Sequence, residues 1–93
     1  MFCNVRLELE LPYSSSLKDK RQTIRSIKDR LRRRNVSVVE SGRQDSWQRA
    51  IMEVTFAAIS AGAAEEKRNE VRGMLLGYPE MIISDWQEDF SKL

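Results

Sequence analysis

Residues 5–35 read VRLELELPYSSSLKDKRQTIRSIKDRLRRRN, and this stretch decides the fold. Its first seven residues alternate apolar and charged side chains, which is the period of a half-buried strand. Pro12 ends that run. Ser16 is then placed to cap a helix, and Asp19, three residues later, forms a weak capping box with it. We therefore predict a helix from about Leu17 to Arg34. Its apolar stripe comprises Leu17, Ile24, Ile27 and Leu31.

The rest of the chain repeats the same two kinds of pattern. Asn35 tolerates the left-handed conformation that closes a helix, and Gly77 offers a similar closure further along. Apolar positions at a period of two indicate three more strands, and a period of 3.6 indicates one more helix. These elements are strands at Val36–Ser41, Trp47–Ile59 and Met81–Trp86, a helix at Ala63–Leu76, and a frayed end at Gln87–Leu93.

The predicted order is therefore βαββαβ. The economical packing for this order is one four-stranded antiparallel sheet with two helices on one face, the ferredoxin-like α+β sandwich. Right-handed crossovers place the first and third strands in the centre of the sheet. A chain of 93 residues suits a single domain, which we expect to span residues 1–93.

Composition narrows the possible functions. Cys3 is the only cysteine, so no internal disulfide is possible. The chain contains no histidine, which removes the commonest general base and metal ligand. It has neither a phosphate-binding glycine loop nor metal-ligand spacing, and its carboxylates are scattered. No apolar run approaches the ~20 residues that span a bilayer, and the N-terminus does not resemble a secretory signal. We expect a cytoplasmic, non-enzymatic protein without cofactor, metal or membrane contact.

Positive charge is concentrated in one segment. Nine of the sixteen basic residues lie between Leu17 and Asn35, where only Asp19 and Asp29 oppose them. The segment carries +7, so the rest of the chain, which is +2 in total, carries −5. On a helix, five of these cations share one flank beside the apolar stripe. We call them the basic row: Lys18, Arg21, Arg25, Lys28 and Arg32.

The basic row has a cost for folding. Like charges three or four residues apart repel each other, and Lys18, Lys20 and Arg21 crowd the positive end of the helix dipole. This local frustration favours a ligand such as the phosphates of a nucleic acid, and we include Lys20 in the predicted contact set. Two alternatives stay open: a merely solvated helix face and an acidic protein partner.

A second candidate site is the 42–49 loop, which contains Gln44, Asp45, Trp47, Gln48 and Arg49. Trp47 is suited to stacking on a base, and Arg49 to gripping a phosphate. The alternative is structural: Trp47 covers the edge of the core, Asp45 sets the turn, and Arg49 pairs with Glu40 or Glu53.

The uncovered sheet face lacks the aromatic residues on which RNA recognition motifs stack bases. Its predicted outward positions include Glu8, Val39, Ile51 and Ile82. A mixture of apolar and charged side chains is compatible with a homodimer contact through this face. Any RNA contact is therefore expected through the basic helix and the 42–49 loop.

Three segments carry a family resemblance, namely SLKDKR at 16–21, NVSVVE at 35–40 and QDSWQRA at 44–50. They closely resemble the YlxP-like family, small bacterial proteins with a domain of unknown function. The resemblance covers nearly the whole chain and implies a ferredoxin-like fold. Genes of that family often lie beside those for translation initiation and ribosome maturation factors, so the resemblance implies an RNA- or ribosome-associated role. It supplies no catalytic residues.

Overall fold

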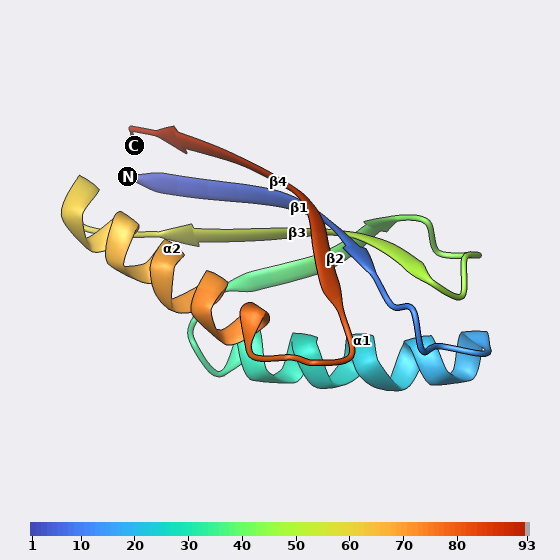
Figure 1. Ribbon diagram of the computed structural model, residues 1–93. Helices are drawn as coiled ribbons and strands as arrows, with labels where there is room; N and C mark the ends of the chain where they lie inside the picture. The colour runs from blue at the N-terminus through green and yellow to red at the C-terminus, as the bar shows by residue number, and fades with distance from the viewer. Residues whose placement is uncertain (93) are drawn as a thin grey trace.

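The computed structural model describes residues 1–92, and in this range four strands and two helices follow the order βαββαβ (Figure 1). The strands are β1 (Phe2–Glu10), β2 (Ser37–Gly42), β3 (Arg49–Ala57) and β4 (Ile82–Ser91), and the helices are α1 (Leu17–Arg32) and α2 (Ala61–Leu76). The sheet order is β2-β3-β1-β4, with every neighbouring pair antiparallel. The predicted ferredoxin-like α+β arrangement, with the first and third strands central, is confirmed.

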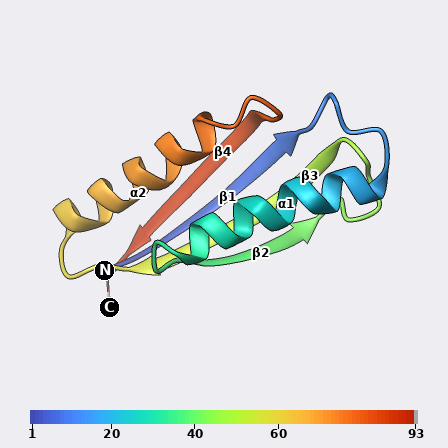
Figure 2. The same cartoon turned by 90° about the horizontal axis from the view of Figure 1, so that it is seen from below.

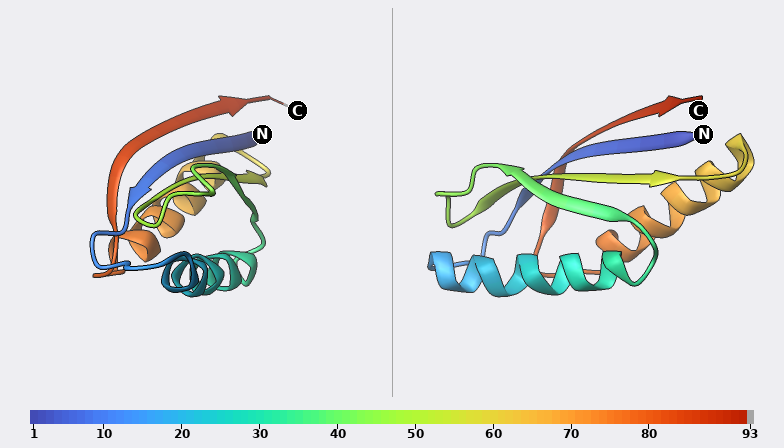
Figure 3. Two further views of the ribbon diagram at one scale, coloured as in Figure 1. Left: turned by 90° about the vertical axis from the view of Figure 1, so that its right-hand side faces the viewer. Right: turned by 180° about the vertical axis from the view of Figure 1, so that it is seen from behind.

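Both helices lie on the same face of the sheet (Figure 2). α1 runs under β2, while α2 runs under β1 and β4. The opposite face of the sheet is uncovered, as the end-on view shows (Figure 3). The molecule therefore has two layers, and its core lies between them.

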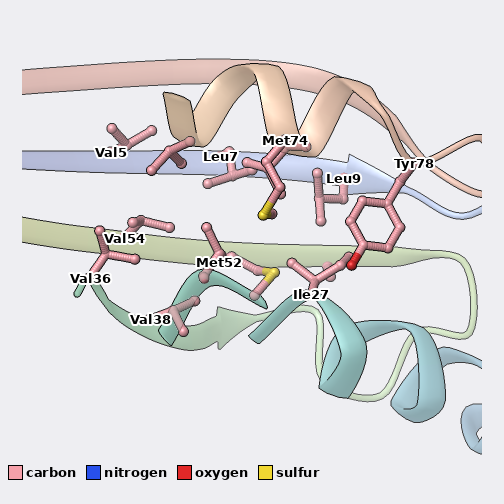
Figure 4. Close-up of a cluster of buried hydrophobic side chains, with 14 of the residues drawn as sticks. Val5, Leu7, Leu9, Ile27, Val36, Val38, Met52, Val54, Met74 and Tyr78 are labelled. Atoms are coloured by element: carbon pink, nitrogen blue, oxygen red, sulfur yellow. The ribbon is translucent and has the colours of Figure 1, made fainter. Parts of the chain in front are cut away.

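The core comprises the inward side chains that the strand alternation predicts. Val5, Leu7 and Leu9 of β1 are at most 1% exposed, and they pack against residues of β3 and both helices (Figure 4). Ile27 of α1 and Tyr78, which follows α2, complete the core on its helical side. The Tyr78 hydroxyl lies 3.3 Å from the Ser26 hydroxyl, which links the two helical segments.

Both helices begin at a serine cap. The Ser16 side chain accepts a hydrogen bond from the Asp19 backbone N–H at 3.1 Å, and Ser60 serves Ala63 in the same way. α1 ends at Arg32, two residues before the predicted end, and Asn35 follows with φ 58°. The left-handed Asn35 agrees with its predicted role in ending the helix. Gly77 differs, because it caps α2 with a right-handed φ of −78°.

Several element boundaries differ from prediction: β1 begins at Phe2 rather than Val5, α2 begins at Ala61 rather than Ala63, and β3 ends at Ala57 rather than Ile59. β3 begins at Arg49 rather than Trp47, so Trp47 lies in the preceding loop. β4 continues to Ser91 instead of fraying after Trp86, and it pairs with β1 over that whole length. Residues 87–91 are mainly polar, which is why their sequence suggested fraying. Leu93 of the predicted frayed end lies outside the described residues.

The β2–β3 pairing shifts register between Glu40 and Gly42. Such a bulge bends a strand and increases its twist. The loop that follows stands over the N-terminal end of α1 (Figure 3). The bulge and loop thus bring the second candidate site close to the basic helix.

Candidate nucleic-acid interface

The basic row of α1 is accessible over most of its length. Lys28 is half-buried and the other four side chains are exposed. Within residues 1–92, no carboxylate lies within 4.0 Å of the charged groups of Lys18, Arg21, Arg25 or Lys28. Arg32 is 4.0 Å from Asp29, and both side chains are more than half exposed. An exposed pair of this kind contributes little stability. The row therefore remains available to an external anion.

Lys20 differs from the row and is a correction to the predicted contact set. Its side chain is 3% exposed, its Nζ donates to the Arg43 carbonyl at 2.6 Å, and it lies 3.0 Å from Glu40 Oε2. No hydrogen-bond donor is aligned with that Glu40 oxygen among the described residues, so the contact is an ion pair rather than a hydrogen bond. The charge of Lys20 is already balanced by Glu40, so it is not available to a phosphate. Its two contacts hold β2 and the following turn against α1.

The turn after β2 is held in a fixed conformation. Arg43 adopts φ 60°, a region that non-glycine residues rarely occupy, and the Ser46 N–H closes the turn on the Arg43 carbonyl at 3.0 Å. Gln48 ties the other side of the loop to the 12–14 segment, because its Nε2 lies 3.4 Å from Pro12 O and 3.3 Å from Ser14 O. The loop is thus anchored at both ends.

A groove of about 500 Å³ lies between α1 and this loop. One wall is helical and includes four members of the basic row, while the other comes from β2 and the turn. Figure 2 shows the loop alongside the N-terminal half of α1. The lining residues are Leu17, Lys20, Arg21, Ile24, Arg25, Lys28, Arg32, Glu40, Gln44 and Asp45. The structure therefore brings the predicted basic row together with part of the predicted loop site.

The other three predicted loop residues, Trp47, Gln48 and Arg49, lie outside the groove lining. Trp47 is 55% exposed, so it does not act as a cover for the core. Arg49 lies on β3, with its guanidinium nitrogens 4.0 Å from Glu8 and 3.8 Å from Glu10. Arg49 thus pairs with glutamates, but the expected partners Glu40 and Glu53 are wrong, because Glu8 and Glu10 of the adjacent strand β1 lie beside it. Arg49 is consequently directed to the uncovered sheet face.

The family assignment rests on the sequence as a whole. A family model described as "Protein of unknown function (DUF503)" matches residues 2–88. The chain belongs to the DUF503 family. A comparison with curated proteins found no match. The matched range covers β1 to β3, both helices, most of β4 and both walls of the groove, so the groove is part of the DUF503 domain.

The position of Lys20 in this DUF503 domain was readable from spacing. Leu17, Ile24 and Leu31 follow a seven-residue interval, and Lys20 and Ile27 occupy the intermediate places of the same stripe. The helical pattern therefore puts Lys20 on the inward face. The sequence gives no comparable sign that Glu40 is the partner, because that pairing depends on how β2 passes over α1.

The uncovered face of the DUF503 sheet is charged and interrupted. Phe2, Val39 and Ile82 are each about half exposed. The strand register separates them: Val39 lies opposite Glu53, and Ile82 lies opposite Glu10. Scattered apolar side chains of this kind do not make a contiguous patch. The geometry gives the predicted homodimer contact little apolar area.

Within residues 1–92, no three Cys, Asp or Glu side chains gather in a way that could hold a metal ion. Cys3 is 0% exposed, and burial raises the pKa of its thiol, so the reactive thiolate is disfavoured. No helix in that same range is long and apolar enough to cross a membrane.

Proposed function

We propose that this DUF503 protein is a non-enzymatic RNA-binding module, of the YlxP-like type, that associates with ribosomal RNA through the groove between α1 and the 43–48 turn. The observation that carries the proposal is the basic row, four of whose cations have no carboxylate partner within residues 1–92. Unpaired cations aligned on one rigid helix suit the regular charge of a phosphate backbone.

Phosphate binding offsets the unfavourable electrostatics of the row. Arg21 and Arg25 are one helical turn apart, as are Arg25 and Lys28, so each repels the next. A phosphate bound between two neighbouring cations attracts both of them, and these two attractions offset the repulsion. Lys20 and Glu40 contribute by fixing the turn over the helix, so the second wall stays in place whether or not RNA is present.

The proposal is tested by removing charge from the row. Arg21→Gln/Arg25→Gln/Lys28→Gln deletes three cations, and glutamine preserves helix propensity. We expect the affinity for a structured ribosomal RNA fragment to fall about 100-fold at 0.1 M salt. The matched control, Arg6→Gln/Arg33→Gln/Lys92→Gln, removes the same charge outside the groove lining and should cost far less.

Circular dichroism of both triple variants shows whether they fold. Equal loss of affinity in two folded variants would mean that overall charge, not the groove, attracts RNA. The absence of any RNA binding by the wild-type protein would reject the proposal.

The alternative proposal is a homodimer through the uncovered sheet face. It is tested by size-exclusion chromatography with light scattering, where it requires a dimer that Val39→Lys disrupts.

A further inference from the structure

We infer that the groove takes an unpaired stretch of RNA rather than a duplex, and that Asp45 selects bases that carry an amino group. The inference rests on the proposed function and specifies the class of RNA that the site accepts. It comes from a difference between the two walls of the groove, one cationic and one rich in hydrogen-bond acceptors.

The helical wall is suited to a phosphate backbone. The groove contains Arg21 at one end of the row and Arg32 at the other, which are separated by about 16 Å along the helix axis. Arg25 and Lys28 lie between them on the same flank. A single strand that follows α1 therefore meets a cation at each turn of the helix.

The opposite wall does not suit phosphates. Glu40 is compensated by Lys20 at 3.0 Å. Asp45 is exposed, and within the 1–92 range its carboxylate has neither an ion-pair partner nor a hydrogen-bond donor. An uncompensated carboxylate repels a phosphate and attracts N–H donors. A strand in the groove is thus oriented with its backbone on α1 and its bases toward Asp45.

Gln44 strengthens the acceptor character of this wall. Its Nε2 donates to the Glu40 carbonyl at 3.1 Å, which leaves the amide oxygen available as an acceptor. Gln44 and Asp45 together therefore offer acceptors to a ligand. Cytosine offers a matching N4 amino group, whereas uracil has a carbonyl oxygen at that position. In an RNA duplex one N4 hydrogen is used in the base pair and the other lies in a deep, narrow major groove that side chains cannot read, so only unpaired bases can use this wall.

Trp47 lies two residues from Asp45 and is exposed enough to stack on a base. Stacking does not distinguish cytosine from uracil strongly, since every base has a π-face. The discrimination between cytosine and uracil therefore depends on the acceptors of Gln44 and Asp45. Comparing the affinities for these two bases separates the role of Asp45 from that of the basic row.

The experiment measures fluorescence anisotropy with labelled oligonucleotides of equal length: oligo(C), oligo(U) and an RNA duplex. We expect wild-type protein to bind oligo(C) roughly tenfold more tightly than oligo(U) or the duplex. Asp45→Ala should reduce the oligo(C)/oligo(U) ratio to nearly one while it tightens oligo(U) binding, because a repulsive charge is lost. Asp89→Ala removes a carboxylate from the opposite face and should leave the ratio unchanged.

The outcomes separate the two proposals. Equal binding of all three ligands that still depends on the basic row would overturn the inference and leave the proposed function intact. A cytosine preference that survives Asp45→Ala would overturn the role of Asp45. No binding of any ligand at up to ~100 μM protein, the weak limit of non-specific affinity, would overturn both proposals. Asp45 is exposed, and circular dichroism verifies that its variant folds.

Discussion

Lys20 joins α1 to β2 and the following turn, because its ammonium group contacts Glu40 and the Arg43 carbonyl. Replacing it with methionine leaves Glu40 under the turn without its partner. We expect Lys20→Met to lower the free energy of unfolding by about 3 kcal/mol, the lower end of the range for breaking a buried pair. Urea denaturation measures this loss. Lys20→Met/Glu40→Leu should recover part of it, and an unchanged midpoint in Lys20→Met would show that the pair does not fasten the turn.

The sequence predicted the positions of the basic row on α1, but it did not predict the contacts of Lys20. The basic row was predictable because helical period alone places Arg21, Arg25 and Lys28 on one flank. Lys20 shares their charge, but its side chain turns inward to Glu40 and the Arg43 carbonyl. That contact joins residues 20 apart in the chain and depends on the path of β2. Local pattern could not supply it.

Trp47 reports directly on the loop. It is half exposed, whereas Trp86 packs against the core beneath the Arg72 guanidinium, 5.2 Å from its ring centroid. We expect RNA to quench and shift Trp47 emission, because a stacked base replaces water at the indole. A Trp86→Phe background isolates the signal. Unchanged emission at saturating RNA would place Trp47 outside the interface.

At the scale of the element, the start of α1 predicts a pH dependence. Asp19 accepts hydrogen bonds from the Ser15 hydroxyl at 2.6 Å and the Ser15 N–H at 3.1 Å, and these bonds lower the pKa of its carboxyl group. The folded pKa lies below the unfolded value of about 3.9, so the stabilisation is present above that pH and is lost as pH falls through the lowered pKa. Thermal melts of the wild type and Asp19→Asn should therefore differ at neutral pH.

The same melts should converge in acid. Once the pH has fallen below the lowered pKa of Asp19, the wild-type carboxyl group is protonated and Asp19→Asn has little left to remove. The Ser16 hydroxyl also caps this helix, and it does not titrate in this range. Its contribution to the melting temperature should therefore stay constant with pH and serves as a control. A difference in melting temperature that is constant from neutral to acidic pH would contradict this account of Asp19.

The C-terminal half of β4 is the element that sequence pattern missed. Residues 87–91 lack an apolar alternation, yet they pair with β1, and Phe90 packs partly against the core beside Arg68. We expect Phe90→Ala to lower the free energy of unfolding by about 2 kcal/mol, less than for a fully buried phenylalanine. Urea denaturation that gives no loss would return this segment to a frayed end.

The remaining elements were predictable because each has a local cause. β1 follows from strict alternation, and α1 follows from the Ser16 cap and its apolar stripe. The order of the strands follows from right-handed crossovers. The bulge at Ser41 and the left-handed Arg43 have no such local signal. They create the second wall of the groove. The sequence therefore predicted residues of the site but not the groove that these residues line.

At the scale of the whole molecule, charge is divided between two faces. The segment from Leu17 to Asn35, which contains α1, carries nine of the sixteen basic residues, while β1, β3 and β4 place Glu8, Glu53 and Asp85 on or near the uncovered face. Such a distribution orients the protein toward a polyanion and steers its approach. RNA is therefore expected to contact the helical side of the molecule and to leave the uncovered face in water.

The salt dependence of RNA affinity tests the central claim most directly. Five cations in the basic row predict that log K falls with log salt at a slope of about −3.5 for single-stranded RNA. Arg21→Gln/Arg25→Gln/Lys28→Gln should bring the slope to about −1.4, since two cations remain. A wild-type slope near zero, or one that the triple variant does not change, would contradict phosphate binding by the basic row.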